Sequence, residues 1–139
     1  MDSGFWQLGI TEEDKPKTAF ATSIGLYQFT VMPFGLVNAP STFQRLMETI
    51  LKGLQWVTCL VYMDDVIVPA QYFSQCLERL EHVFMRFLEA NLKLKPSKCS
   101  FFQKKLEFLG HIVSSDGVET DPKKWNRSDS GLFQNQLNR

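Results

Sequence analysis

The spacing of apolar and polar residues divides the chain into short extended segments and two amphipathic helices. The first helix is predicted to begin after Asn38, with Pro40 in its first turn, and to end near Gly53. Its apolar residues recur every three or four positions and form one buried face: Phe43, Leu46, Met47, Ile50, Leu51 and Leu54. Six short segments have strand-like patterns: 5–10, 18–22, 27–32, 92–94, 106–109 and 112–113.

The second helix is predicted over residues 74–90, and Asn91 is a suitable C-terminal stop. Its apolar face consists of Leu77, Leu80, Phe84, Phe87 and Leu88. Strands mixed with two helices predict an α+β fold, with an antiparallel sheet on one side and the helices on the other.

Two adjacent acids, Asp64 and Asp65, lie between the apolar runs 59–61 and 66–68. Two strands joined by about two residues form a hairpin, and Asp tolerates the backbone angles of a tight turn. Because side chains alternate along a strand, we expect one acid to bind a metal ion directly and the other to support it. Taken alone, an Asp-Asp turn is more often a solvated turn, at odds of roughly three to one. Other motifs must decide between these interpretations.

Length and composition favour one globular domain, because 139 residues with 44% hydrophobic and 22% charged residues can form a single core. The apolar runs are far shorter than the ~20 residues of a membrane span, and the N-terminus lacks a signal-peptide pattern. We therefore expect an intracellular, cytoplasmic chain that is neither secreted nor membrane-bound. Three cysteines without Cys-x-x-Cys spacing indicate neither a disulfide framework nor a zinc site.

Charge is unevenly distributed although the net charge is zero. Residues 1–91 carry six basic and ten acidic groups, whereas residues 92–139 carry nine basic and five acidic groups. The C-terminal part has enough cations to neutralise phosphates: Lys93, Lys95, Lys98, Lys104, Lys105, Lys123, Lys124 and Arg127. A solvated lysine-rich surface explains the same pattern equally well.

Three motifs occur in a characteristic order: Ser3-Gly4-Phe5-Trp6-Gln7, Met32-Pro33-Phe34-Gly35-Leu36-Val37-Asn38-Ala39-Pro40 and Tyr62-Met63-Asp64-Asp65. With these motifs the chain resembles a reverse transcriptase, an RNA-directed DNA polymerase. Three further segments are similar to the palm of gypsy-class long-terminal-repeat retrotransposon polymerases: 15–20, 43–45 and 108–111. The resemblance covers residues 3–124.

The resemblance implies a polymerase palm-like antiparallel sheet with two packed helices, as an incomplete domain. We expect residues 1–124 to form a partial reverse transcriptase palm domain. Residues 125–139 match no part of the family and lack a regular hydrophobic period, so we expect a divergent, disordered tail.

The implied chemistry is two-metal nucleotidyl transfer, which needs two divalent ions about 4 Å apart. Asp64 would be the direct ligand, and Asp65 would position or support the ions. Mg²⁺ suits carboxylates on a rigid hairpin, with Mn²⁺ as a substitute. The partners of the intact family are an RNA or DNA template with its primer, and deoxynucleoside triphosphates.

The resemblance also assigns nucleotide-binding residues: Phe5, Phe34, Gly35, Tyr62, Met63 and Lys98. Phe5 would be an aromatic gate against the ribose 2′-hydroxyl, although a core aromatic is an equally good interpretation. Gly35 would let the backbone approach the nucleotide closely. Lys98 would assist pyrophosphate release.

A primer grip is implied at Leu109, Gly110 and His111, where the family holds the primer strand. His111 is as readily explained by an ordinary surface histidine.

The first catalytic acid of the family has no counterpart in this chain. When Ser3, Gly4 and Phe5 are placed in register, that acid precedes Met1, and Asp2 is displaced from its position by about 6.6 Å. The family's fingers lie upstream and its thumb lies downstream, so we expect these residues alone to be inactive.

Two alternatives remain: a non-catalytic nucleic-acid-binding remnant, or a pseudogene product. An intact element would encode a polyprotein with fused ribonuclease H and integrase regions and would act in a virus-like particle.

Overall fold

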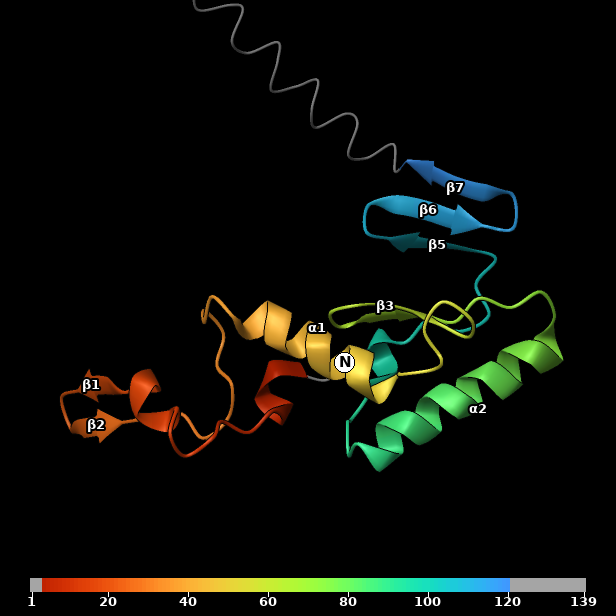
Figure 1. The fold of residues 1–139 in the computed structure, drawn as a ribbon. Coiled ribbons are helices and arrows are strands. Elements are labelled where there is room, and N and C mark those ends of the chain that lie inside the picture. The colour runs from red at the N-terminus through yellow and green to blue at the C-terminus, as the bar shows by residue number, and fades with distance from the viewer. Residues whose placement is uncertain (1–3, 121–139) are drawn as a thin grey trace, which may run out of the picture. The chain divides into compact units, whose positions relative to one another are not determined.

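The computed structural model describes residues 4–120 and divides the chain into two compact units between Cys99 and Ser100. The first unit contains nine elements (Figure 1): the 3₁₀ helices η1 Gly4–Gln7, η2 Lys15–Thr18 and η3 Pro96–Lys98, the α-helices α1 Ala39–Ile50 and α2 Phe73–Glu89, and the strands β1 Phe20–Thr22, β2 Gly25–Tyr27, β3 Leu60–Tyr62 and β4 Asp65–Ile67. The second unit contains β5 Lys105–Phe108, β6 His111–Ser114 and β7 Gly117–Thr120. The tail predicted over residues 125–139 lies outside the described residues.

All strand pairs among the described residues are antiparallel, and they form three small sheets. Two sheets are the hairpins β1–β2 and β3–β4, and the third is the meander β5–β6–β7. Two helices with small antiparallel sheets confirm the α+β, palm-like fold class. The sheet itself is divided into three parts instead of being continuous.

The first predicted strand, over residues 5–10, is wrong for most of its length. The chain forms η1 there, and the Leu8 N–H donates a hydrogen bond to the Phe5 carbonyl oxygen over 3.1 Å. The tight turn directs the Phe5 ring toward Phe43 and the Trp6 ring toward Phe29. Both rings thereby find packing partners. In a strand, Phe5 and Trp6 would have pointed to opposite faces.

The predicted strand over residues 92–94 is also absent. The Gln7 side chain takes the role of a partner strand, because its Nε2 donates to the Lys93 carbonyl over 3.0 Å and its Oε1 accepts from the Lys93 N–H over 2.7 Å. A side-chain amide can satisfy both backbone groups of one residue, so this segment needs no ladder.

The two helices follow the prediction closely. Helix α1 has Pro40 in its first turn, and Gly53 follows it with a φ of +83°. Helix α2 ends before Asn91, whose φ of +53° is the left-handed conformation of a C-terminal stop. No helix within residues 4–120 is long and apolar enough to cross a membrane.

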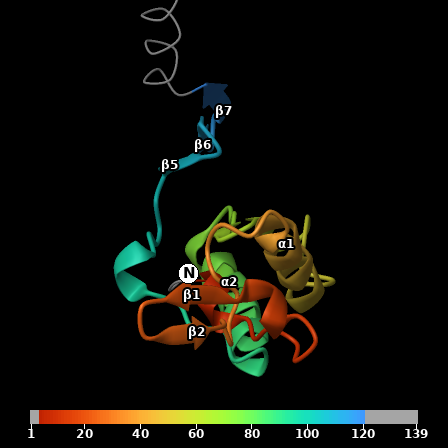
Figure 2. The same ribbon diagram turned by 90° about the vertical axis from the view of Figure 1, so that its left-hand side faces the viewer.

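The core of the first unit is formed by α1, α2 and residues of the β3–β4 hairpin; Figure 2 shows where α1 and α2 lie in this unit. Phe43, Met47 and Leu51 of α1 are completely buried and pack with Val83 and Phe87 of α2. The buried face predicted for α1 is therefore confirmed. The predicted face of α2 is only partly covered, because three of its members are exposed: Leu77, Phe84 and Leu88.

Cys59 leads directly into β3 and is buried in this core, and its burial raises the pKa of its thiol. Cys76 and Cys99 are partly exposed. We expect Cys76 and Cys99 to react promptly with a thiol reagent in the native protein, and Cys59 only after local or global opening. A time course with Ellman's reagent, with and without denaturant, measures this. Loss of the slow phase in Cys59→Ala identifies the thiol, and three equal rates would contradict the burial.

Candidate functional site

The acid pair lies at a hairpin turn, as its sequence predicts. Tyr62 at the end of β3 pairs with Asp65 at the start of β4, and Met63 and Asp64 form the two-residue connection. Met63 has a φ of +49°, which is a left-handed conformation that few side chains adopt. Asp64 and Asp65 are both exposed. The turn therefore presents two carboxylates on a short, strictly registered hairpin.

The N-terminal motif approaches this turn through Gly4. A Cβ atom built on Gly4 would lie 2.6 Å from Asp64 Oδ1 and 2.8 Å from Phe43 Cζ. Glycine is needed because a larger residue would displace either the carboxylate or a ring that is completely buried. Gly4 thus brings η1 directly against the acid turn, and the contact specifies where the Asp64 carboxylate lies.

Gln44 of α1 forms a hydrogen bond with the turn, and the sequence alone did not predict this role. The Met63 N–H donates to Gln44 Oε1 over 2.6 Å, and Gln44 Nε2 donates to Glu48 Oε1 over 2.8 Å. The available signals were its place in segment 43–45, which resembles the palm of the family, and its position directly after the buried Phe43. That position alone does not reveal which backbone group the amide meets.

The middle motif joins the same neighbourhood through aromatic rings. The Phe5 ring lies 5.4 Å, between centroids, from both Phe34 and Phe43. Phe34 is 65% exposed, whereas Phe5 is half-buried, so the pair forms a partly open aromatic surface next to Gly4. Gly35 follows with a φ of +92° and open space around its α-carbon. The three motifs that are separate in sequence are therefore joined by contacts at Gly4, Phe5 and Phe43.

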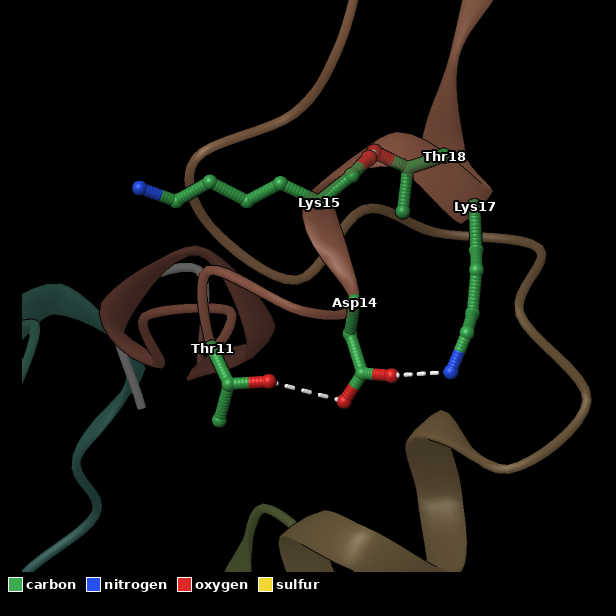
Figure 3. A network of polar contacts seen from close by, with 5 residues as sticks. All are labelled: Thr11, Asp14, Lys15, Lys17 and Thr18. Atoms are coloured by element: carbon green, nitrogen blue, oxygen red, sulfur yellow. Dashed lines mark hydrogen bonds and ion pairs between the residues drawn. The ribbon is translucent and has the colours of Figure 1, made fainter.

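The carboxylates of Asp64 and Asp65 make no ion pair or side-chain hydrogen bond within residues 4–120. Their oxygens are therefore accessible for a cation. Asp14 shows the opposite situation (Figure 3), because its carboxylate accepts hydrogen bonds from Lys17 and Thr11. The Lys17 hydrogen bond is the largest cause of the lowered pKa of Asp14, followed by the Thr11 bond.

Carboxylate oxygens on a rigid turn are the kind of donor that Mg²⁺ prefers. The described residues contain no group of three or more His, Cys, Asp or Glu side chains that could hold a metal ion. The Asp64–Asp65 pair therefore fits such an ion in chemistry, and two carboxylates would make up only part of its coordination shell.

The remaining predicted site residues are one lysine of the first unit and three residues of the second unit. Lys98 ends η3 and is exposed. In the second unit, Leu109 and Gly110 connect β5 to β6 with φ values of +51° and +77°, and His111 pairs with Phe108. His111 Nδ1 lies 3.2 Å from the Leu109 carbonyl oxygen. The hairpin predicted for the primer grip is present, and the roles of these four residues stay predictions.

Comparison with known proteins decides the family. The family model described as reverse transcriptase (RNA-dependent DNA polymerase) matches residues 1–113. The chain belongs to the reverse transcriptase family. Members of this family use divalent metal ions, which agrees in kind with the exposed acid pair.

The gypsy-class resemblance is confirmed by relatives in Drosophila melanogaster. The chain is 47% identical to the retrovirus-related Pol polyprotein from transposon 297 over 124 residues, which are 89% of this chain and 12% of the relative. It is 38% identical to the Pol polyprotein from transposon gypsy, again over 124 residues, 89% of this chain and 12% of the relative. The chain therefore spans about one eighth of the length of these relatives.

Solved structures confirm the fold. The chain is similar to the foamy viral protease-reverse transcriptase in complex with dsDNA, with a TM-score of 0.78 and 27% identity over 94% of this chain and 30% of that one. The same viral protein in complex with an RNA/DNA hybrid gives a TM-score of 0.77 and 27% identity over 89% of this chain and 17% of that one.

Proposed function

We propose that the Tyr62–Asp65 turn is the surviving metal-binding part of a two-metal nucleotidyl-transfer centre in an RNA-directed DNA polymerase. The observation that carries this proposal is the convergence of three motifs, in which Gly4 packs against Asp64 and Phe5 packs against Phe34. A solvated turn would not need a side-chain-free neighbour at its carboxylate. Family membership supplies the chemistry for which such a turn is suited.

Asp64 is the direct ligand in this proposal, and Asp65 positions or supports the ions. Adjacent carboxylates repel each other, so a bound cation stabilises the folded turn. Two Mg²⁺ ions, or Mn²⁺ in their place, would activate the primer 3′-hydroxyl and stabilise charge on the triphosphate. The hairpin register and the Gly4 contact fix the carboxylates in advance of binding, which reduces the reorganisation needed during the reaction.

The aromatic surface next to the acids binds the incoming nucleotide. Phe5 packs edge-on against the buried Phe43 ring, and this contact supports its proposed role as a gate against a 2′-hydroxyl. Phe34 is exposed and Gly35 leaves open space beside the backbone, so both can approach a base or sugar. Tyr62 and Met63 flank the turn and would contact the primer end and the sugar.

Nucleic acid is the proposed partner, as a template with its primer, together with deoxynucleoside triphosphates. The similar foamy viral enzyme is described in complex with dsDNA and with an RNA/DNA hybrid. Exposed lysines lie on both described units and suit phosphate contacts: Lys93, Lys95, Lys98, Lys104 and Lys105. Lys98 of the first unit is proposed to assist pyrophosphate release, and Leu109, Gly110 and His111 of the second unit are proposed to hold the primer strand.

The 139 residues on their own are proposed to be inactive, because they supply two of the family's metal-binding acids and none at the position of the first. Removing one preorganised group from an active site typically costs about 10² to 10³ in rate. Residues 1–124 are proposed to be the palm portion of a larger cytoplasmic polyprotein. The RNA-directed DNA polymerase activity of that polyprotein is part of the same proposal.

A variant with one Asp added directly before Met1 tests this function. The added acid should raise Mn²⁺ affinity by about 10-fold or more, since it completes the ligand set, and Asp64→Asn should abolish that gain. Isothermal titration of the four proteins of this double-mutant cycle measures the coupling. Independent, additive effects of the two acids would contradict a shared metal centre.

Primer extension on an RNA template with Mg²⁺ provides the second readout. The unmodified 139 residues should not extend the primer. Extension that is lost in Asp64→Ala would overturn the proposed inactivity while supporting the site.

A nucleic-acid-binding remnant is the second candidate, and the exposed lysines favour it. In that case nucleic-acid binding should weaken steeply with salt. The logarithm of the binding constant should fall with the logarithm of the salt concentration, with a slope of roughly −0.7 to −0.9 for each phosphate contact. Binding that is unaffected by Mg²⁺ and by Asp64→Ala, together with no Asp64-dependent metal binding, would support this candidate. Unfolding without a cooperative transition would instead indicate a pseudogene product.

A further inference from the structure

We propose that Gln44 is a positioning residue that holds Met63 in its left-handed conformation and thereby keeps the Asp64 carboxylate against Gly4. This inference deepens the proposed function and rests on it, because the positioned group is the proposed metal ligand. Gln44 itself contacts neither the ion nor the substrate in this account.

The geometry of the amide allows only one arrangement. The Glu48 carboxylate can only accept, so Gln44 Nε2 must face it, at 2.8 Å. The amide oxygen then faces the hairpin and accepts the Met63 N–H at 2.6 Å. Glu48 lies one helical turn after Gln44, so helix α1 fixes the positions of both the amide and the carboxylate that orients it.

The turn needs this support because its sequence does not suit its backbone. Among the two loop residues only Met63 has a positive φ, which is the pattern of a type II′ turn, where glycine is favoured at the first position. The β5–β6 turn has positive φ at both Leu109 and Gly110, and glycine there relieves half of the requirement. The Met63–Asp64 turn contains no glycine, so an external acceptor must select its conformation.

The hydrogen bond from Met63 to Gln44 restrains Asp64 as well, because Asp64 is the next residue in the chain. The Met63 N–H is fixed to α1 on one side, and Asp64 Oδ1 is limited by Gly4 on the other. Both Gly4 and Gln44 are held by the same helix, because Phe43 packs at the Gly4 α-carbon and immediately precedes Gln44. Loss of the Gln44 bond would leave only one of these two restraints.

A pair of matched glutamine variants tests the inference. Gln44→Met keeps the side-chain length but removes the acceptor. Gln75→Met removes an equivalent bond in α2, where Gln75 Oε1 accepts the Gln71 N–H over 2.9 Å. Exchanging the pair, Gln44→Glu with Glu48→Gln, keeps an acceptor oxygen for the Met63 N–H and an amide donor beside it, so this double variant is the conservative rescue. Amide hydrogen exchange by NMR reads the Met63 N–H directly, and an Mn²⁺ titration reads the site.

Gln44→Met should speed exchange of the Met63 amide at least about 10-fold and weaken Mn²⁺ binding by about 10-fold, as for other outer partners of metal ligands. Gln75→Met should change neither quantity, and the exchanged pair Gln44→Glu/Glu48→Gln should keep the Met63 amide protected. An unchanged Met63 amide or an unchanged Mn²⁺ affinity in Gln44→Met would overturn the inference. If Gln44→Met does not fold, loss of Met63 protection in the Gln44→Glu/Glu48→Gln protein would overturn it instead.

Asp64→Asn in the same titration separates this inference from the proposed function. If Asp64→Asn lowers Mn²⁺ affinity and Gln44→Met does not, only the positioning role fails. If Asp64→Asn leaves the affinity unchanged, the proposed metal site itself fails.

Discussion

Replacing Phe43 with alanine is expected to lower the free energy of unfolding of the first unit by about 3–5 kcal/mol, a large part of its stability. The Phe43 side chain is 0% exposed, packs edge-on against Phe5 and reaches the Gly4 α-carbon. Truncation of a buried Phe typically costs about 3–5 kcal/mol, while a domain of this size is stabilised by about 5–15 kcal/mol. Because the Phe43 ring also packs against Gly4, which lies beside Asp64, the variant should disturb the acid turn together with the core. Urea and thermal denaturation followed by circular dichroism measure the effect.

The same substitution at Phe73 provides the control. Phe73 begins α2 and is 63% exposed, so Phe73→Ala should cost less than about 1 kcal/mol. A denaturation midpoint for Phe43→Ala close to that of Phe73→Ala would show that Phe43 is not the centre of the core.

The helices could be predicted from sequence because their signals are local and mutually consistent. In α1, Pro40 marks the first turn and the three-and-four spacing of Phe43, Met47 and Leu51 marks the buried face. The acid hairpin was similarly predictable, since two apolar runs separated by two residues leave little freedom of register.

The extended segments were less predictable because side chains replaced backbone partners. Residues 5–10 alternate like a strand, yet packing of Phe5 on Phe43 favours a 3₁₀ turn. Residues 92–94 also have strand character, but their backbone partner is the Gln7 side chain, 86 positions away from Lys93. No local pattern reports a contact at that separation.

The candidate site shows the same division. Asp64 and Asp65 were evident from the sequence, and the family motifs identified Phe5 and Phe34. The role of Gln44 was not evident from the sequence, because it depends on the left-handed conformation of Met63 and not on the residue type at position 44. The sequence therefore identified the groups proposed to carry the chemistry and missed Gln44, which is proposed to fix their geometry.

Replacing Asp64 with asparagine is expected to remove the metal site while leaving the fold intact. The carboxylate is exposed and makes no hydrogen bond or ion pair within residues 4–120, so the hairpin does not depend on its charge. Loss of an outer partner of a metal ligand costs about 10 to 100-fold in affinity, so loss of a direct ligand should reach or exceed the upper value. Asp65→Asn should have the smaller effect, because Asp65 supports the ions in this account.

Asp116 offers a closely matched control within the same chain. It is the second residue of another two-residue hairpin connection, since Ser114 pairs with Gly117 across the β6–β7 turn. The Asp116 N–H donates a hydrogen bond to the Ser114 hydroxyl, and the Asp116 carboxylate accepts one from the Ser115 hydroxyl. Asp116 therefore represents an ordinary turn aspartate.

The most direct test of the metal site is an Mn²⁺ titration, followed by electron paramagnetic resonance, of the unmodified chain, Asp64→Asn and Asp116→Asn. The account predicts binding that falls by about 100-fold or more in Asp64→Asn and is unchanged in Asp116→Asn. Equal Mn²⁺ affinity in all three proteins would contradict it and would make Asp64 a solvated turn residue like Asp116.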